Sequence, residues 1–158
     1  MCVLAPLNIQ IGAIPITLAT FAIYIMAATT TPSYAVATVI CYIALGAVGL
    51  PVFSGFEGGI QKLFGITGGY MIGYIPCTLI ISVLVSKMSI KHIFPISMAL
   101  GTAIIYVFGV ARYMLEARCT VWSALTLCVI PFLAGDAMKI AFASIIAPKI
   151  RSQLEKIT

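Results

Sequence analysis

Charged side chains are scarce in this sequence of 158 residues, and their scarcity excludes most soluble folds. Only 8% of the residues are charged, none of them precedes Glu57, and 62% are hydrophobic. A soluble domain is typically about 25% charged and about 45–50% apolar. This chain therefore cannot cover its outside with polar groups. We expect an integral membrane protein whose outer surface contacts the lipid bilayer.

Groups that carry catalysis or bind metals are also few, with one histidine and four acidic residues. We find no nucleophile–base pair, carboxylate dyad or metal-ligand cluster, and the phosphate-binding pattern G-x-x-x-x-G-K-[ST] is unmatched. The five cysteines form no C-x-x-C pair and fall mostly in apolar runs, where cysteine behaves as a small hydrophobic residue. The sequence therefore predicts no enzymatic activity, no metal and no cofactor.

The formal net charge of +5 does not indicate a nucleic-acid partner, because of where the basic residues lie. Lys87 follows one apolar run, and Lys149, Arg151 and Lys156 lie in the C-terminal tail. Basic residues beside apolar spans follow from the positive-inside rule. We therefore expect a multi-pass protein of the bacterial cytoplasmic membrane with a cytoplasmic C-terminus, and no nucleic-acid binding.

Apolar runs predict an all-α bundle of transmembrane helices in a single domain, residues 1–158. A spanning helix needs about 20 mostly apolar residues. We expect spans at about 15–28, 33–48, 69–86, 93–110 and 121–148, with a glycine-rich connection at 49–68. If the basic tail is cytoplasmic, five spans place residue 1 outside. We therefore expect a further first helix, encoded upstream of Met1.

Nine of the 13 glycines fall between Gly46 and Gly73, in GAVGLPVFSGFEGGIQKLFGITGGYMIG. Glycine lets the backbone adopt positive φ angles and lets a ligand or another helix approach closely. One interpretation is a loop that covers a ligand and offers it backbone N–H groups. The other is helix packing through small residues, for which Gly69 and Gly73 have the required spacing.

Asp136 and Lys139 are charged residues inside the last apolar run, spaced so that they share one helix face. If Pro148 marks the inner boundary, Lys139 lies about 14 Å above it, near the centre of the bilayer. A charge there costs roughly 2.5–3.5 kcal/mol. Either the two residues form an internal ion pair that fixes helix packing, or they line a polar pocket for a ligand.

Five segments in order carry a resemblance to a known family: GLPVFSGFEGG, GITGGYMIGY, LGTAIIYVFGV, PFLAGDAMK and APKIR. They resemble the BioY family, the biotin-binding S components of energy-coupling factor (ECF) transporters, and IPITLATF resembles its second helix. The resemblance covers almost the whole chain. It implies a six-helix membrane bundle, of which the first helix is largely missing here, and high-affinity capture of biotin from outside. It also implies three partners: an ECF transmembrane subunit and two ATPase subunits.

The resemblance further implies which residues bind the transported ligand. The polar site falls on Asp136 and Lys139. The cover of the pocket falls on a second group of residues: Gly58, Gly59, Thr67, Gly68, Gly69 and Tyr70. The chain departs from the family where Ile66 replaces a usual proline and where Ala19 replaces a common glutamine.

Other functions remain open on the sequence alone. The chain could be an S component for another vitamin. It could also be a structural membrane protein in which Asp136 and Lys139 only hold helices together. An intramembrane enzyme is disfavoured, because no constellation of catalytic residues is visible.

Overall fold

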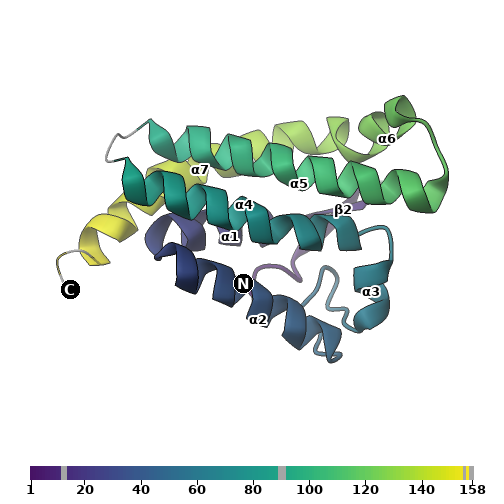
Figure 1. Ribbon diagram of the computed structural model, residues 1–158, viewed down its shortest axis with the longest axis horizontal. Helices are drawn as coiled ribbons and strands as arrows, with labels where there is room; N and C mark the ends of the chain where they lie inside the picture. The colour runs from purple at the N-terminus through teal and green to yellow at the C-terminus, as the bar shows by residue number, and fades with distance from the viewer. Residues whose placement is uncertain (12–13, 89–91, 155, 157–158) are drawn as a thin grey trace.

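The computed structural model describes residues 1–11, 14–88, 92–154 and 156. The described residues form five longer helices, which make up the body of the molecule, and two short ones in the connections α2–α4 and α5–α7 (Figure 1). The body consists of α1 (Ala19–Thr29), α2 (Pro32–Ala47), α4 (Gly68–Lys87), α5 (Ile93–Ala117) and α7 (Ile130–Leu154). The short helices are α3 (Ile60–Phe64) and α6 (Val121–Cys128). The expected all-α membrane bundle is therefore confirmed as a class.

A small antiparallel hairpin precedes the helices and corrects the expected start of the first span. Strand β1 (Asn8–Ile11) pairs with β2 (Ile14–Thr17), in a register that places Asn8 opposite Thr17. Residues 15–17 are thus strand rather than helix, because the hairpin satisfies their backbone and β-branched residues suit a strand. Helix α1 then begins at Ala19, whose N–H donates to the Thr17 hydroxyl at 3.2 Å.

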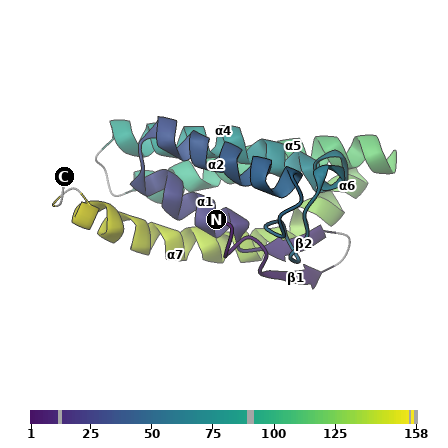
Figure 2. The same cartoon turned by 90° about the horizontal axis from the view of Figure 1, so that it is seen from below.

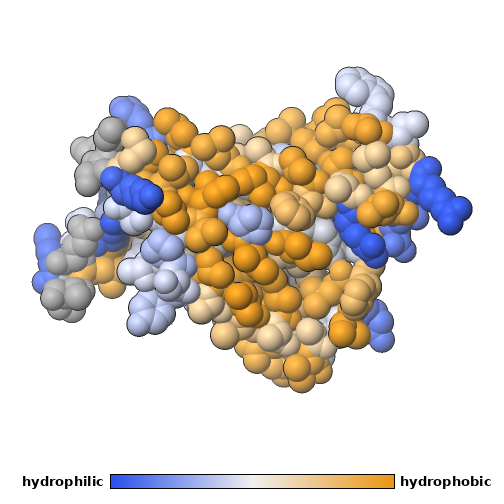
Figure 3. All heavy atoms as spheres, viewed as in Figure 1, coloured by the Kyte–Doolittle hydropathy of each residue, from blue (hydrophilic) through white to orange (hydrophobic). Residues whose placement is uncertain are grey.

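Within the described ranges, three helices are long and apolar enough to cross a bilayer: α4, α5 and α7. Helices α1 and α2 are apolar but shorter, with 11 and 16 residues. Thr30 and Thr31 separate them in extended conformation, and Pro32 takes the first position of α2, where a missing N–H costs nothing. Figure 3 shows hydrophobic residues over the middle of the molecule and hydrophilic ones towards its two ends, as a bilayer requires.

The last expected span, 121–148, is two helices rather than one. Helix α6 ends at Cys128, Val129 leaves helical geometry with φ −125° and ψ −55°, and α7 begins at Ile130. Helix α7 then continues through Pro148 to Leu154, so Pro148 does not end it. The other helices agree with the expected spans to within a turn, except that α5 runs on to Ala117.

One end of the bundle is covered by two segments far apart in sequence: the N-terminal residues and the connection between α2 and α4 (Figure 2). Two hydrogen bonds join them. Gly55 N–H donates to the Pro6 carbonyl at 3.0 Å, and the Asn8 amide donates to the Ser54 hydroxyl at 2.6 Å. The expected connection 49–68 is not all loop, because α3 lies within it and Gly68 already belongs to α4.

Candidate functional site

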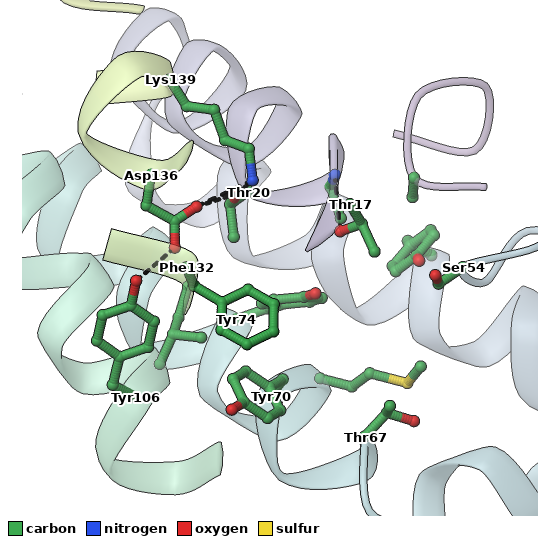
Figure 4. A pocket seen from close by; sticks show the side chains of 15 residues that line it. Thr17, Thr20, Ser54, Thr67, Tyr70, Tyr74, Tyr106, Phe132, Asp136 and Lys139 are labelled. Carbon is green, nitrogen blue, oxygen red and sulfur yellow. Dashed lines mark hydrogen bonds and ion pairs between the residues drawn. The ribbon is translucent and has the colours of Figure 1, made fainter. Parts of the chain in front are cut away.

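A pocket opens inside the helical bundle, beneath these covering segments (Figure 4). Its cavity volume is about 60 Å³, within about 600 Å³ of empty space that includes the opening. The described residues that line it come from both covering segments and from five helices: Ala5, Thr17, Ala19, Thr20, Tyr42, Ser54, Thr67, Tyr70, Met71, Tyr74, Ile105, Tyr106, Phe132, Asp136 and Lys139.

The expected pair on α7 lies at one end of the pocket and forms an ion pair. Lys139 Nζ is 2.9 Å from Asp136 Oδ1, and the two side chains are only 11% and 8% exposed. Thr20 on α1 joins them, since its hydroxyl accepts from Lys139 at 3.2 Å and donates to Asp136 at 3.4 Å. The two interpretations of this pair therefore coexist in the structure. It links α7 to α1, and it also faces a pocket.

Tyr106 on α5 completes this polar end. Its hydroxyl donates to Asp136 Oδ2 at 2.6 Å, so each carboxylate oxygen has a partner from another helix. Figure 4 shows Tyr106 and Thr20 reaching Asp136 from opposite sides. A buried carboxylate is tolerated only when it is paired and hydrogen-bonded. Here the ammonium of Lys139 and two hydroxyl groups meet that requirement. We call Asp136, Lys139, Thr20 and Tyr106 the inner polar cluster.

The remaining walls are aromatic, with hydroxyl groups at the far end. Tyr70, Tyr74 and Phe132 lie between the inner polar cluster and the covering segments, where Ser54 and Thr67 face the pocket (Figure 4). One end of the site holds an ion pair without net charge, the middle is apolar, and the other end is again polar. It suits an elongated ligand with polar groups at both ends.

Of the predicted cover residues, Thr67 and Tyr70 line the pocket. The Tyr70 ring contributes a wall, but its hydroxyl donates to the backbone carbonyl of Cys128 at 2.9 Å. This hydroxyl is therefore engaged by the protein rather than left for a ligand.

The four predicted glycines are not among the described lining residues, and each has a structural reason to be glycine. A Cβ on Gly58 would lie 2.8 Å from the carbonyl oxygen of Gly49. At Gly68 it would collide with the backbone of Leu63, and at Gly69 it would lie 2.5 Å from the Cβ of Arg112. Gly59 has a φ of 105°, which L-residues rarely adopt. Close contact with neighbouring atoms therefore accounts for Gly58, Gly68 and Gly69, and backbone conformation accounts for Gly59. Their role in covering a ligand stays a prediction.

Sequence reasoning missed two members of the inner polar cluster, Thr20 and Tyr106. Tyr74 is 8% exposed, and it lines the pocket together with Tyr106. For Thr20, the only signal was its place in IPITLATF. For Tyr106, no spacing in the sequence relates α5 to Asp136 on α7.

A second cavity, of about 480 Å³, lies between α1 and α7. Its lining is almost wholly apolar and includes Phe21, Met138 and Phe142, and Lys139 and Thr17 border both cavities. It offers few polar groups to orient a ligand, whereas the first pocket offers several. On chemical grounds the first pocket is therefore the candidate ligand site.

Comparisons with known proteins point in one direction. The BioY family model matches residues 1–156. The biotin transporter BioY of Thermotoga maritima is 34% identical over 148 residues, covering 92% of this chain and 85% of that protein. The probable biotin transporter BioY of Pyrococcus horikoshii is 33% identical over 148 residues, covering 93% and 86%.

A solved structure shares the fold. The crystal structure of the S-component for biotin from an ECF-type ABC transporter superposes with a TM-score of 0.88 at 24% sequence identity. The match covers 96% of this chain and 84% of that one. The arrangement of helices is therefore that of a solved membrane protein.

Proposed function

The chain belongs to the BioY family, and on that premise we propose that it captures biotin for high-affinity uptake across the bacterial cytoplasmic membrane. The observation that carries the proposal is the buried Asp136–Lys139 pair at the end of a pocket within the membrane-spanning bundle. Relatives similar over most of this chain are named biotin transporters, which makes biotin the first ligand to test.

The inner polar cluster fits the ureido ring of biotin, which combines two N–H donors with one carbonyl oxygen. A lysine ammonium has three donors, and the structure commits two of them, to Asp136 and Thr20. One donor remains for a ligand oxygen. Each carboxylate oxygen can accept about two hydrogen bonds. Asp136 Oδ2 accepts one from the described residues, from Tyr106, which leaves capacity for a ligand N–H.

The carboxylate of biotin then lies at the opposite end, near Ser54 and Thr67. Asp136 and Lys139 together carry no net charge, so a ligand anion beside them would lack a compensating cation in a medium of low dielectric constant. Near the covering segments, hydroxyl groups and solvent are available to a carboxylate. The apolar middle of the pocket receives the thioether ring and the aliphatic tail.

The cavity of about 60 Å³ has room for a few water molecules but not for biotin, so lining side chains must move apart on binding. Flexible side chains such as Met71 are suited to that movement. We expect binding to be slower than simple encounter, because it depends on this opening.

The test is calorimetry of the detergent-purified chain with biotin, beside thiamine and riboflavin. Biotin should bind saturably, and Lys139→Met should weaken binding more than tenfold, which corresponds to about 1.4 kcal/mol. Biotin amide, which lacks the carboxylate, should bind within tenfold of biotin, whereas iminobiotin, altered in the ureido ring, should bind more weakly. Folded protein that binds thiamine or riboflavin instead would identify an S component for another vitamin. No binding at all would favour a structural role.

Transport requires energy, and the sequence contains no match to the phosphate-binding pattern G-x-x-x-x-G-K-[ST]. We propose that it works with an ECF transmembrane subunit and two ATPase subunits, by itself performs no catalysis and needs no cofactor, with its C-terminus in the cytoplasm. The positive-inside rule supports this orientation, because Lys149 and Arg151 lie at the C-terminal end of α7. Co-expression with such a module should give ATP-dependent biotin uptake, and a reporter fused to the C-terminus should be cytoplasmic.

A further inference from the structure

The break between α6 and α7 leaves a backbone carbonyl without its usual helical partner. In a continuous helix the N–H of Phe132 would donate to the carbonyl of Cys128, four residues earlier. Here it donates to the Val129 carbonyl at 3.0 Å. The Cys128 carbonyl instead accepts a hydrogen bond at 2.9 Å from the hydroxyl of Tyr70, in the first turn of α4. A side chain of α4 therefore supplies the hydrogen bond that this carbonyl lacks at the helix break.

Tyr70 is held firmly enough to act as an anchor. Its ring lies against Gly109 on α5, where an added Cβ would come within 2.5 Å of the ring. The glycine makes room for the ring at this position. Because the ring is confined between α4 and α5, the place of its hydroxyl is set by those two helices, which pack closely along their length.

The three α7 residues that line the pocket all follow the break. Phe132, Asp136 and Lys139 lie three, seven and ten residues beyond Val129. At 1.5 Å per residue, Asp136 is about 10 Å along the helix from that point. A tilt of about 10° there would move Asp136 by about 2 Å. Such a shift is enough to break its 2.6 Å hydrogen bond with Tyr106.

We propose that Tyr70 is a positioning residue: its hydroxyl, bonded to the Cys128 carbonyl, sets the direction of α7 and so holds Asp136 and Lys139 in the geometry that binds ligand. The proposal rests on the proposed function for the identity of the ligand, but the coupling itself is a property of the ligand-free chain. The Tyr70 hydroxyl thus acts on the site through its bond to the backbone of Cys128, whereas the Tyr70 ring forms part of the pocket wall.

The experiment uses two matched variants that each remove one hydroxyl, Tyr70→Phe and Tyr113→Phe. Tyr113 lies on α5 in the same hydrophobic cluster as Cys128 and Phe132, and it makes no side-chain hydrogen bond to the described part of the chain. Biotin affinity is measured by calorimetry. We expect Tyr70→Phe to weaken binding about tenfold and Tyr113→Phe to change it less than twofold.

A second readout reports on the break directly. Cys128 and Cys77 are both fully buried, one at the break and the other in the α4–α5 core. With Cys2, Cys41 and Cys119 replaced by serine, the rate of maleimide labelling at these two thiols is followed by mass spectrometry. We expect Tyr70→Phe to accelerate labelling of Cys128 at least fivefold without biotin, to leave Cys77 unchanged, and to lose this acceleration when biotin is saturating.

Each alternative outcome is decisive. If affinity falls but Cys128 labelling does not change, the hydroxyl contacts the ligand directly and the positioning role is wrong. If Cys128 and Cys77 both label faster, the variant loosens the whole bundle, which also contradicts the proposal. If affinity and labelling both match the unsubstituted chain, the hydrogen bond positions nothing. Failure of the unsubstituted chain to bind biotin would reject the proposed function, whereas the labelling of the ligand-free variants would still test the coupling.

Discussion

Two polar clusters in this molecule have similar chemistry and different surroundings. The inner polar cluster sets Asp136 and Lys139 among α1, α5 and α7, with side chains 8% and 11% exposed. The outer polar cluster, Arg112 and Glu116 on α5, is 30% and 48% exposed. There the Arg112 guanidinium also donates to the carbonyls of Phe64 and Gly65 at the end of α3.

The difference shows that the contribution of an ion pair to stability depends on how the remaining charge is solvated when one partner is lost. Water can solvate an exposed partner, so surface pairs contribute about 0–1 kcal/mol. Breaking a buried pair leaves an uncompensated charge and costs about 3–5 kcal/mol. A pair kept at that cost inside a membrane bundle is expected to have a function. Four substitutions test this contrast.

Lys139→Met should have the largest effect, because it leaves the Asp136 carboxylate buried without its cation. We expect a loss of about 3–5 kcal/mol in the free energy of unfolding, measured by denaturant titration in detergent. The double variant Asp136→Leu/Lys139→Met removes both charges and should recover most of that stability without recovering biotin binding. If the double variant still binds biotin tightly, the pair is structural only.

Tyr106→Phe should have the next largest effect. It removes a 2.6 Å hydrogen bond to Asp136, and hydrogen bonds to charged groups contribute about 1.5–3 kcal/mol. We expect lower thermal stability together with weaker biotin binding by calorimetry. Tyr113→Phe on the same helix is the control and should change neither. An unaltered Tyr106→Phe variant would show that Asp136 depends only on Lys139 and Thr20.

Gly69→Ala should be intermediate and should affect folding rather than binding. The new methyl would overlap the Cβ of Arg112 and the backbone of Phe108, and overpacking costs about 1–3 kcal/mol. Gly65→Ala is the control, because its nearest atom would be 3.4 Å away and its φ of −80° suits alanine. Biotin affinity of the folded fraction should stay the same. A specific loss of affinity in stable Gly69→Ala protein would restore Gly69 as a ligand residue.

Glu116→Gln should have the smallest effect. Arg112 keeps its bonds to the carbonyls of α3, and the lost ion pair is exposed and screened by salt. We expect a change of less than about 0.5 kcal/mol in the free energy of unfolding, further reduced at high ionic strength. A destabilisation comparable to that of Lys139→Met would contradict the distinction between the two clusters.

The sequence could predict those residues whose charge is energetically costly at their place in the chain. Asp136 and Lys139 stood out because charges deep in an apolar run need a partner, and the i, i+3 spacing identified that partner. Thr20 and Tyr106 did not stand out, because threonine and tyrosine are common in membrane helices and lie 116 and 30 residues from Asp136. Only the packing of three helices brings them together.

Local composition was therefore enough to predict a helical membrane protein, the approximate positions of most of its helices and two charged residues inside the last apolar run. Hydrophobicity and charge are properties of single residues, and they determine directly which segments enter the bilayer and how these are oriented. Composition did not show that Gly69 accommodates Arg112, that Tyr70 caps a helix break, or that residues 15–17 pair as a strand. Each of these depends on the approach of segments distant in sequence, and close packing in three dimensions sets that approach.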